Sequence, residues 1–130
     1  MWGTYQNSEL RVEVTANADD IRRSLTEPKS LQAWLRPQQL KTTSGGSLST
    51  ASLSEGQVFE SHLGPLKVRH KVELLSDEGV RFLLSEGIDG FHEWQWGEGW
   101  VQSRIEGVSL LPLNLGQTAS MLRLRHYLQQ

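Results

Sequence analysis

The stretch Leu-Lys-Val-Arg-His-Lys-Val-Glu-Leu, residues 66–74, alternates strictly between apolar and charged side chains, with one histidine among the apolar ones. Successive residues of a β-strand point to opposite faces, so this stretch predicts a strand with one apolar and one charged face. Antiparallel sheets commonly bury one face and leave the other in water. Residues 66–74 therefore predict an antiparallel sheet that rests on a hydrophobic core, with His70 on the core side.

Short turns that contain glycine divide the surrounding chain into further strands. Because no helical period interrupts residues 57–108, they predict an antiparallel meander. The predicted turns are Gly64-Pro65, Asp77-Glu78-Gly79, Gly87 to Gly90 and Gly97-Glu98-Gly99.

The register of these strands follows from placing the apolar residues on one inner face. The same register brings opposite charges together on the outer face, which supports it. The outer pairs are Glu60 with Arg69, Glu73 with Arg81, and Glu93 with Arg104. The predicted inner pairs are Leu63 with Leu66, Phe59 with His70, Val72 with Phe82, His70 with Leu84, Leu74 with Val80, Leu84 with His92, Phe82 with Trp94, Trp94 with Ser103, and His92 with Ile105.

The chain before the meander predicts an arm, a strand and two short helices. Residues 1–7 are expected to form a flexible arm, and residues 8–130 a single domain whose first strand covers residues 9–15. Asn17 is a plausible N-cap for a helix that ends near residue 25, and Pro28 fits the first turn of a second helix. The polar residues 42–54 predict a long loop, for which a functional flap and disorder are equally open.

The chain after the meander predicts a helix over residues 114–128. Its expected apolar side, which includes Leu115, Met121 and Leu122, would cover the inner face of the sheet. Arg125 falls in the middle of that side, so it must be paired, reach solvent or face a wet cavity.

Composition excludes several kinds of protein. The net charge is −2 and there is no cysteine, so neither a nucleic-acid-binding stripe nor a thiolate zinc site is expected. The sequence holds no apolar run of membrane-spanning length, and its first residues lack the features of a signal peptide. We therefore expect a cytoplasmic protein.

The segment Ile21 to Pro37, with the step Glu27-Pro28 and Trp34 near its end, resembles the opening of many START-like (SRPBCC superfamily) domains. The resemblance extends over residues 9–130 and implies an α+β helix-grip fold of order β-α-α-β(6)-α. In that fold a curved antiparallel sheet wraps around the C-terminal helix and encloses a cavity. Members bind lipids, sterols, polyketides, plant hormones or quinones, and some are cyclases, dehydratases or co-chaperones. No catalytic signature of an enzyme branch is matched.

The resemblance implies that the inner face binds a small, mostly apolar molecule such as a lipid, a polyketide or an isoprenoid-like compound. Two histidines, His70 and His92, are candidate polar or catalytic groups, although each alone is typical of a neutral core histidine. No metal site is expected, because the predicted inner face has no carboxylate, and no cofactor is expected. The candidate ligand-binding residues are Phe59, His70, Phe82, Leu84, His92, Trp94, Trp96, Ser103, Met121 and Arg125.

Two alternatives stay open beside ligand binding. One is an enzyme of the cyclase or dehydratase type that uses His70 or His92 as its base. The other is a protein-interaction domain with a collapsed cavity, which acts through its outer sheet face or residues 42–54. The sequence favours binding over catalysis, and it leaves the ligand and the oligomeric state open.

Overall fold

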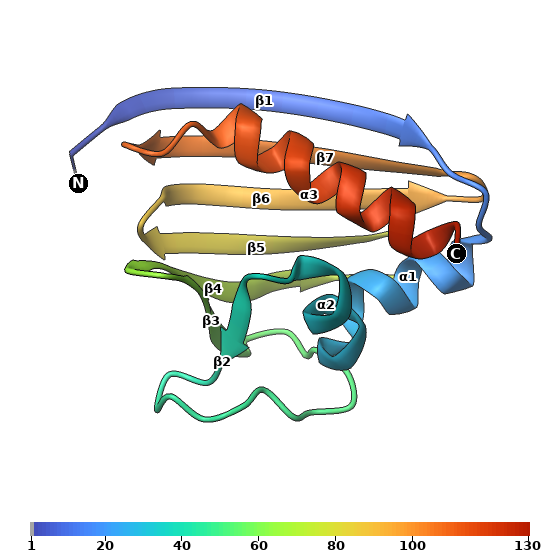
Figure 1. The fold of residues 1–130 in the computed structure, drawn as a ribbon, viewed down its shortest axis with the longest axis horizontal. Helices are drawn as coiled ribbons and strands as arrows, with labels where there is room; N and C mark the ends of the chain where they lie inside the picture. Colours follow the sequence, from blue (N-terminus) through green and yellow to red (C-terminus); the bar gives the residue numbers. More distant parts are fainter. Residues whose placement is uncertain (1) are drawn as a thin grey trace.

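A seven-stranded antiparallel sheet forms the frame of the protein in the computed structural model, which describes residues 2–130 (Figure 1). The strand order is β1-β7-β6-β5-β4-β3-β2, with β1 and β2 at the two edges. This arrangement confirms the predicted α+β helix-grip fold of order β-α-α-β(6)-α. The elements are β1 (Thr4–Glu13), α1 (Ala18–Thr26), α2 (Pro28–Leu35), β2 (Gln39–Lys41), β3 (Val58–Leu63), β4 (Leu66–Leu75), β5 (Gly79–Glu86), β6 (Asp89–Gly97), β7 (Trp100–Ser109) and α3 (Leu113–Leu128).

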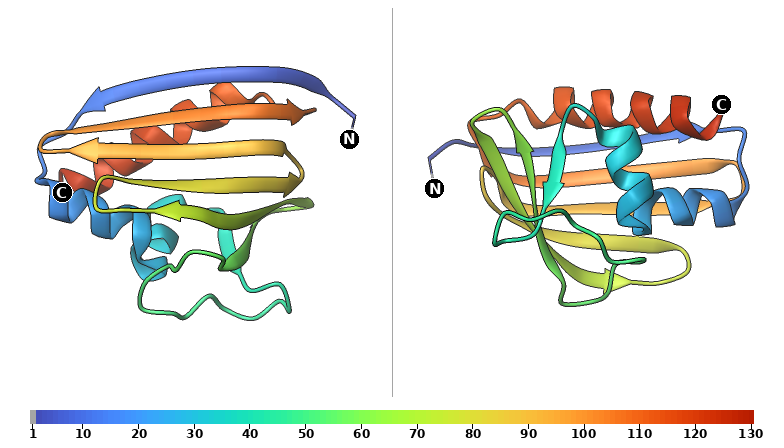
Figure 2. Two further views of the ribbon diagram at one scale, coloured as in Figure 1. Left: turned by 180° about the vertical axis from the view of Figure 1, so that it is seen from behind. Right: turned by 60° about the horizontal axis from the view of Figure 1, so that its bottom comes forward.

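The two short helices α1 and α2 start at the signals that the sequence carries. The side chain of Asn17 caps α1 by accepting a hydrogen bond from the backbone N–H of Asp20, and Pro28 stands in the first turn of α2. The indole Nε1 of Trp34 donates to the carbonyl oxygen of Ser24 at 2.8 Å, and this bond ties α2 to α1. Both helices lie with α3 on one face of the sheet (Figure 2).

Helix α3 covers the sheet with a different side from the one predicted. Its buried residues are Leu113, Gln117, Met121 and Leu124, whereas Leu115 and Leu122 are 67% and 57% exposed. Arg125 is exposed and does not face the sheet. Met121 is buried as predicted. The prediction for Leu115, Leu122 and Arg125 was wrong because leucines occur on both sides of this helix, so the apolar pattern alone does not define its buried side.

The register of β3, β4 and the β6–β7 pair agrees with the prediction, and that of β5 differs in two places. An irregularity between Val72 and Leu74 shifts β4, so Leu75 instead of Leu74 pairs with Val80. Leu74 is consequently 56% exposed. The β5–β6 pair is offset by two residues. Phe82 lies opposite His92 instead of Trp94, Leu84 lies opposite Gly90 instead of His92, and Val80 lies opposite Trp94.

The outer face of the sheet carries a network of ion pairs. Arg69 Nη2 lies 3.3 Å from Glu60 Oε2, and Arg81 Nε lies 2.9 Å from Glu73 Oε1, as the charge pattern predicts. Glu60 is buried, and the neighbouring His62, Arg69 and Lys67 side chains lower the pKa of its carboxyl below the ordinary value. His62 is half-buried, and its Nε2 lies 3.0 Å from Glu60 Oε1.

The ends of the polar segments are more ordered than the sequence suggests. Residues 4–7, expected in a flexible arm, form the first part of β1 and pair with residues 106–109 of β7. Near the end of the loop at residues 42–54, the side chain of Leu53 is buried, and its N–H donates to the carbonyl oxygen of Thr26 at 2.8 Å. This segment is therefore held against α1 at its C-terminal end.

Candidate functional site

A pocket of about 390 Å³ lies between the inner face of the sheet and the first half of α3. Leu63 and Leu66 at the β3–β4 turn and Leu115 on α3 line it, and all three are more than two-fifths exposed, so the pocket opens to solvent between them. Its lining is Gln38, Ser61, Leu63, Leu66, Val68, His70, Leu84, Ile88, His92, Ile105, Leu111, Pro112, Leu113, Leu115, Gly116, Gln117, Ala119, Ser120 and Arg123.

Strand β4 brings His70 to the pocket wall, and aromatic rings hold its imidazole in place. The imidazole stacks on Phe59 with ring centroids 4.9 Å apart, and it meets Phe82 edge to face at 5.6 Å. Nδ1 of His70 lies 3.2 Å from the carbonyl oxygen of Val68. Burial lowers the pKa of His70 to about 4, against a smaller opposite effect of this hydrogen bond, so the ring is neutral at pH 7.

Strand β6 brings His92 to the same wall, where it belongs to a buried polar chain. Nε2 of His92 lies 2.6 Å from Ser103 Oγ, and Gln117 Nε2 donates to that oxygen at 3.0 Å. Gln117 Nε2 also donates to the carbonyl oxygens of Ser103 and Ser8, so its amide is oriented by two groups that only accept. Burial, with a smaller effect of charge on His70, lowers the pKa of His92 to about 3.

Only some of the predicted ligand-binding residues reach this pocket. His70, Leu84 and His92 line it, and Ser103 lies behind His92. Arg125 lies on the solvent side of α3, away from the lining. The remaining predicted residues are buried in the hydrophobic core and do not line the pocket; they are Phe59, Phe82, Trp94, Trp96 and Met121.

The pocket residues that the sequence reasoning missed come mainly from α3 and the segment before it. Gln117 and Arg123 lie on the lining side because α3 is rotated relative to the predicted helix. Gln117 is 3% exposed, and its buried position follows from the rotation of α3, which the apolar pattern of the helix does not define. Arg123 is half-buried and takes the place at the pocket that the prediction gave to Arg125.

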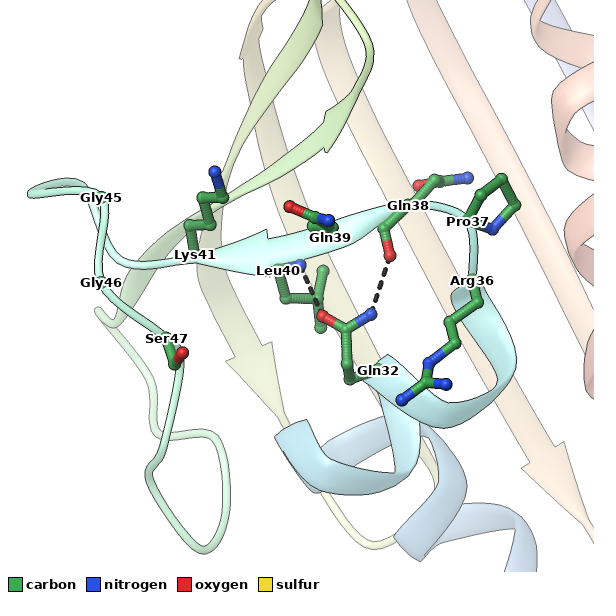
Figure 3. Close-up of a pocket in the computed structure, with 10 residues that line it drawn as sticks. All are labelled: Gln32, Arg36, Pro37, Gln38, Gln39, Leu40, Lys41, Gly45, Gly46 and Ser47. Carbon is green, nitrogen blue, oxygen red and sulfur yellow. Dashed lines mark hydrogen bonds between the residues drawn. The ribbon is translucent and has the colours of Figure 1, made fainter.

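A second hollow, of about 710 Å³, lies between the end of α2, β2 and the following loop (Figure 3). Its side chains are largely polar, and the amide of Gln32 donates to the carbonyl oxygen of Gln38 and accepts from the N–H of Leu40 (Figure 3). This amide is satisfied by the protein itself and is therefore not free to bind a ligand.

Two classes of site have no support in the part of the chain described. Residues 2–130 contain no group of three or more histidine, aspartate or glutamate side chains placed to hold a metal ion. Among the three helices of these residues, none is both long enough and apolar enough to span a membrane.

Comparison with known proteins supports the fold. No protein-family model matches the sequence, and neither does any curated protein. Solved structures do match. The Aha1 dimer from Colwellia psychrerythraea has 15% identity and a TM-score of 0.72, over 95% of this chain and 96% of that one. A protein from Chromobacterium violaceum has 15% identity and a TM-score of 0.71, over 95% and 98%.

A third similar structure is norcoclaurine synthase from Thalictrum flavum, in complex with dopamine and hydroxybenzaldehyde. It has 17% identity and a TM-score of 0.61, over 95% of this chain and 86% of that one. At these identities the matches establish the helix-grip fold.

Proposed function

We propose that this protein binds a small, mostly apolar molecule in the pocket between the sheet and α3. The observation that carries the proposal is the pocket itself. Its volume of about 390 Å³ falls within the range of ligand sites, and aliphatic side chains with a few polar groups line it. A pocket of this kind between sheet and helix fits a carrier or a sensor of a small molecule in the cytoplasm.

The solved structures add support for a small-molecule ligand. Norcoclaurine synthase, which shares this fold, holds dopamine and hydroxybenzaldehyde, two small aromatic molecules. Lipid, polyketide and isoprenoid-like compounds also remain candidates for this chain, because an aliphatic lining binds each of them through burial of apolar surface.

Catalysis is the weaker alternative because the pocket histidines are poor bases at neutral pH. A general base works best when its pKa lies near the working pH, and the pKa values of His70 and His92 are about 4 and 3. The alternative of an interaction domain with a collapsed cavity has no specific observation in its favour.

The first experiment is native mass spectrometry of freshly purified protein, followed by organic extraction of any bound molecule. We expect a discrete additional mass that the extraction identifies as a small, mostly apolar compound. Protein that stays bare after incubation with lipid and polyketide extracts would overturn the proposal.

A variant that blocks the pocket tests whether the ligand binds there. Gly116 lies at the wall, and a Cβ added there meets no atom within 4 Å, so the side chain of Gly116→Leu extends into open space without disturbing the core. We expect this variant to lose the bound mass. The control is Arg125→Leu, which adds leucine to the solvent side of the same helix and should keep it. Retention of the ligand by Gly116→Leu would show that it binds elsewhere.

A further inference from the structure

The pocket wall presents a histidine nitrogen, His70 Nε2, whose role as an acceptor is fixed by the protein. The other ring nitrogen, Nδ1, lies 3.2 Å from the carbonyl oxygen of Val68. A carbonyl oxygen only accepts hydrogen bonds, so Nδ1 must carry the proton. In the neutral ring this leaves a lone pair on Nε2.

The same wall presents a nitrogen of the opposite role on His92. Ser103 is fully buried, and its hydroxyl accepts a hydrogen bond from Gln117 Nε2. Within residues 2–130 the acceptor within reach of the hydroxyl proton is His92 Nε2, at 2.6 Å. Because a buried hydroxyl proton without an acceptor costs free energy, Ser103 donates to Nε2. His92 therefore carries its own proton on Nδ1, which is a donor.

Both atoms are open to a ligand. Among the described residues, neither His70 Nε2 nor His92 Nδ1 has a hydrogen-bond partner, and neither belongs to the fully buried side-chain atoms that lack one. Each atom is therefore accessible, and both histidines line the pocket. The wall thus offers one acceptor and one donor, surrounded by aliphatic side chains.

We propose that the ligand is a neutral hydroxylated molecule, an alcohol or a phenol, whose hydroxyl donates a hydrogen bond to His70 Nε2. His92 Nδ1 is available as a donor to an acceptor elsewhere on the ligand. This assignment rests on the proposed function and specifies its ligand. A hydroxyl can donate to the lone pair of His70 Nε2, whereas a carboxylate only accepts hydrogen bonds. An ammonium group could donate to this nitrogen, but it would lose its hydration among the aliphatic residues, and the guanidinium of Arg123 on the lining would repel it.

The test compares two aromatic probes that differ by one methyl group, 2-naphthol and 2-methoxynaphthalene. Both have the same ring system, but the methyl ether cannot donate to His70. We expect 2-naphthol to bind about fivefold more tightly, the effect of one hydrogen bond of typical strength. Affinities are measured by titration in backbone amide NMR spectra, which also show whether the shifted resonances belong to pocket residues.

Variants of His70 test whether the preference for 2-naphthol over 2-methoxynaphthalene depends on this residue. His70→Phe keeps a ring that can stack on Phe59 and removes the acceptor, so both probes should bind with nearly equal affinity. His70→Gln keeps an acceptor oxygen and should restore part of the preference. The control His62→Phe alters the outer face of the sheet and should leave the preference unchanged.

The outcomes separate the two proposals. Equal affinity of the wild-type protein for both probes would overturn the hydroxyl assignment while leaving the proposed function intact. A preference that survives in His70→Phe would overturn the assignment to His70. Binding of neither probe, in protein that also purifies without any bound mass, would overturn both proposals.

Discussion

His92 Nε2 and Ser103 Oγ lie 2.6 Å apart on the neighbouring strands β6 and β7, although Trp94 and not His92 is the direct cross-strand partner of Ser103. The contact is diagonal, and it joins a pocket residue to the buried amide of Gln117 on α3. Strand and helix are thus connected through one hydroxyl group. The arrangement determines which nitrogen of His92 carries a proton.

Loss of the Ser103 hydroxyl is expected to change which ring nitrogen of His92 carries the proton. In the wild-type protein, nitrogen-15 spectra of the imidazole should show the form protonated at Nδ1. In Ser103→Ala the acceptor role of Nε2 is no longer imposed, so the form protonated at Nε2 should become populated. A wild-type spectrum with the proton on Nε2 would contradict the hydrogen-bond direction inferred for Ser103.

Acid should destabilise the protein through His70 and His92. Their pKa values are about 4 and 3 in the folded state, below the ordinary value of 6.5, so the unfolded chain binds more protons as the pH falls. The stabilising effect is complete above pH 6.5 and is lost as the pH falls from there toward the folded-state values. Between pH 7.5 and pH 5 we expect a loss of roughly 2 kcal/mol for each histidine in the free energy of unfolding.

Urea denaturation of the wild type and of His70→Phe at the two pH values checks this expectation. The variant should lose about half of the pH dependence, because one of the two neutral histidines is absent. The lowered pKa of Glu60 acts below its ordinary value of 4.5, outside this interval. An unchanged pH dependence in the variant would mean that His70 is not the group responsible.

Replacement of Trp94 by alanine is expected to destabilise the core. The side chain is 4% exposed, its ring lies 6.0 Å from that of Trp34 in an edge-to-face contact, and it also packs on His92. Removal of a buried aromatic side chain typically costs about 3–5 kcal/mol in the free energy of unfolding. Chemical denaturation at pH 7.5 measures this loss.

The matched control is Trp100→Ala. Trp100 is only partly buried, and the guanidinium of Arg11 lies over its ring at 4.1 Å. We expect a cost of about 1 kcal/mol, typical of an exposed cation–π contact. Equal losses in the two variants would contradict the distinction between a core and an edge tryptophan.

The sequence predicts the sheet well wherever the alternation of side chains is strict. In β4 one apolar face and one charged face leave a single register with β3, so Phe59 and His70 are correctly paired. The prediction of the β5–β6 register was wrong by two residues. A shift of two residues keeps the same side chains on the inner face, so the alternation cannot distinguish the two pairings. Turn length then decides between them, and the glycine-rich turn at residues 87–90 allows either.

The pocket was harder to predict because it depends on how α3 is rotated. Leucines at positions 115, 122 and 124 point to different sides of the helix, and only Leu124 is buried. The buried polar chain through Ser103 and Gln117 anchors a side that is rotated from the expected one, and Arg123 instead of Arg125 lines the pocket. Such a hydrogen bond joins residues distant in sequence, so no local pattern reveals it.

Two glycines should respond in opposite ways to alanine. At Gly90 an added Cβ would overlap the carbonyl oxygen of Glu106 and lie 2.6 Å from the Cα of Gly107, so strands β6 and β7 would have to separate. We expect Gly90→Ala to lose about 2–3 kcal/mol in the free energy of unfolding, as overpacked sites do. At Gly116 the added atom meets open space in the interior of a helix, where alanine is favoured over glycine by about 1 kcal/mol. Thermal unfolding of the two variants should therefore give midpoints on opposite sides of the wild type, and a Gly90→Ala midpoint at or above that of the wild type would contradict the close approach of β6 and β7.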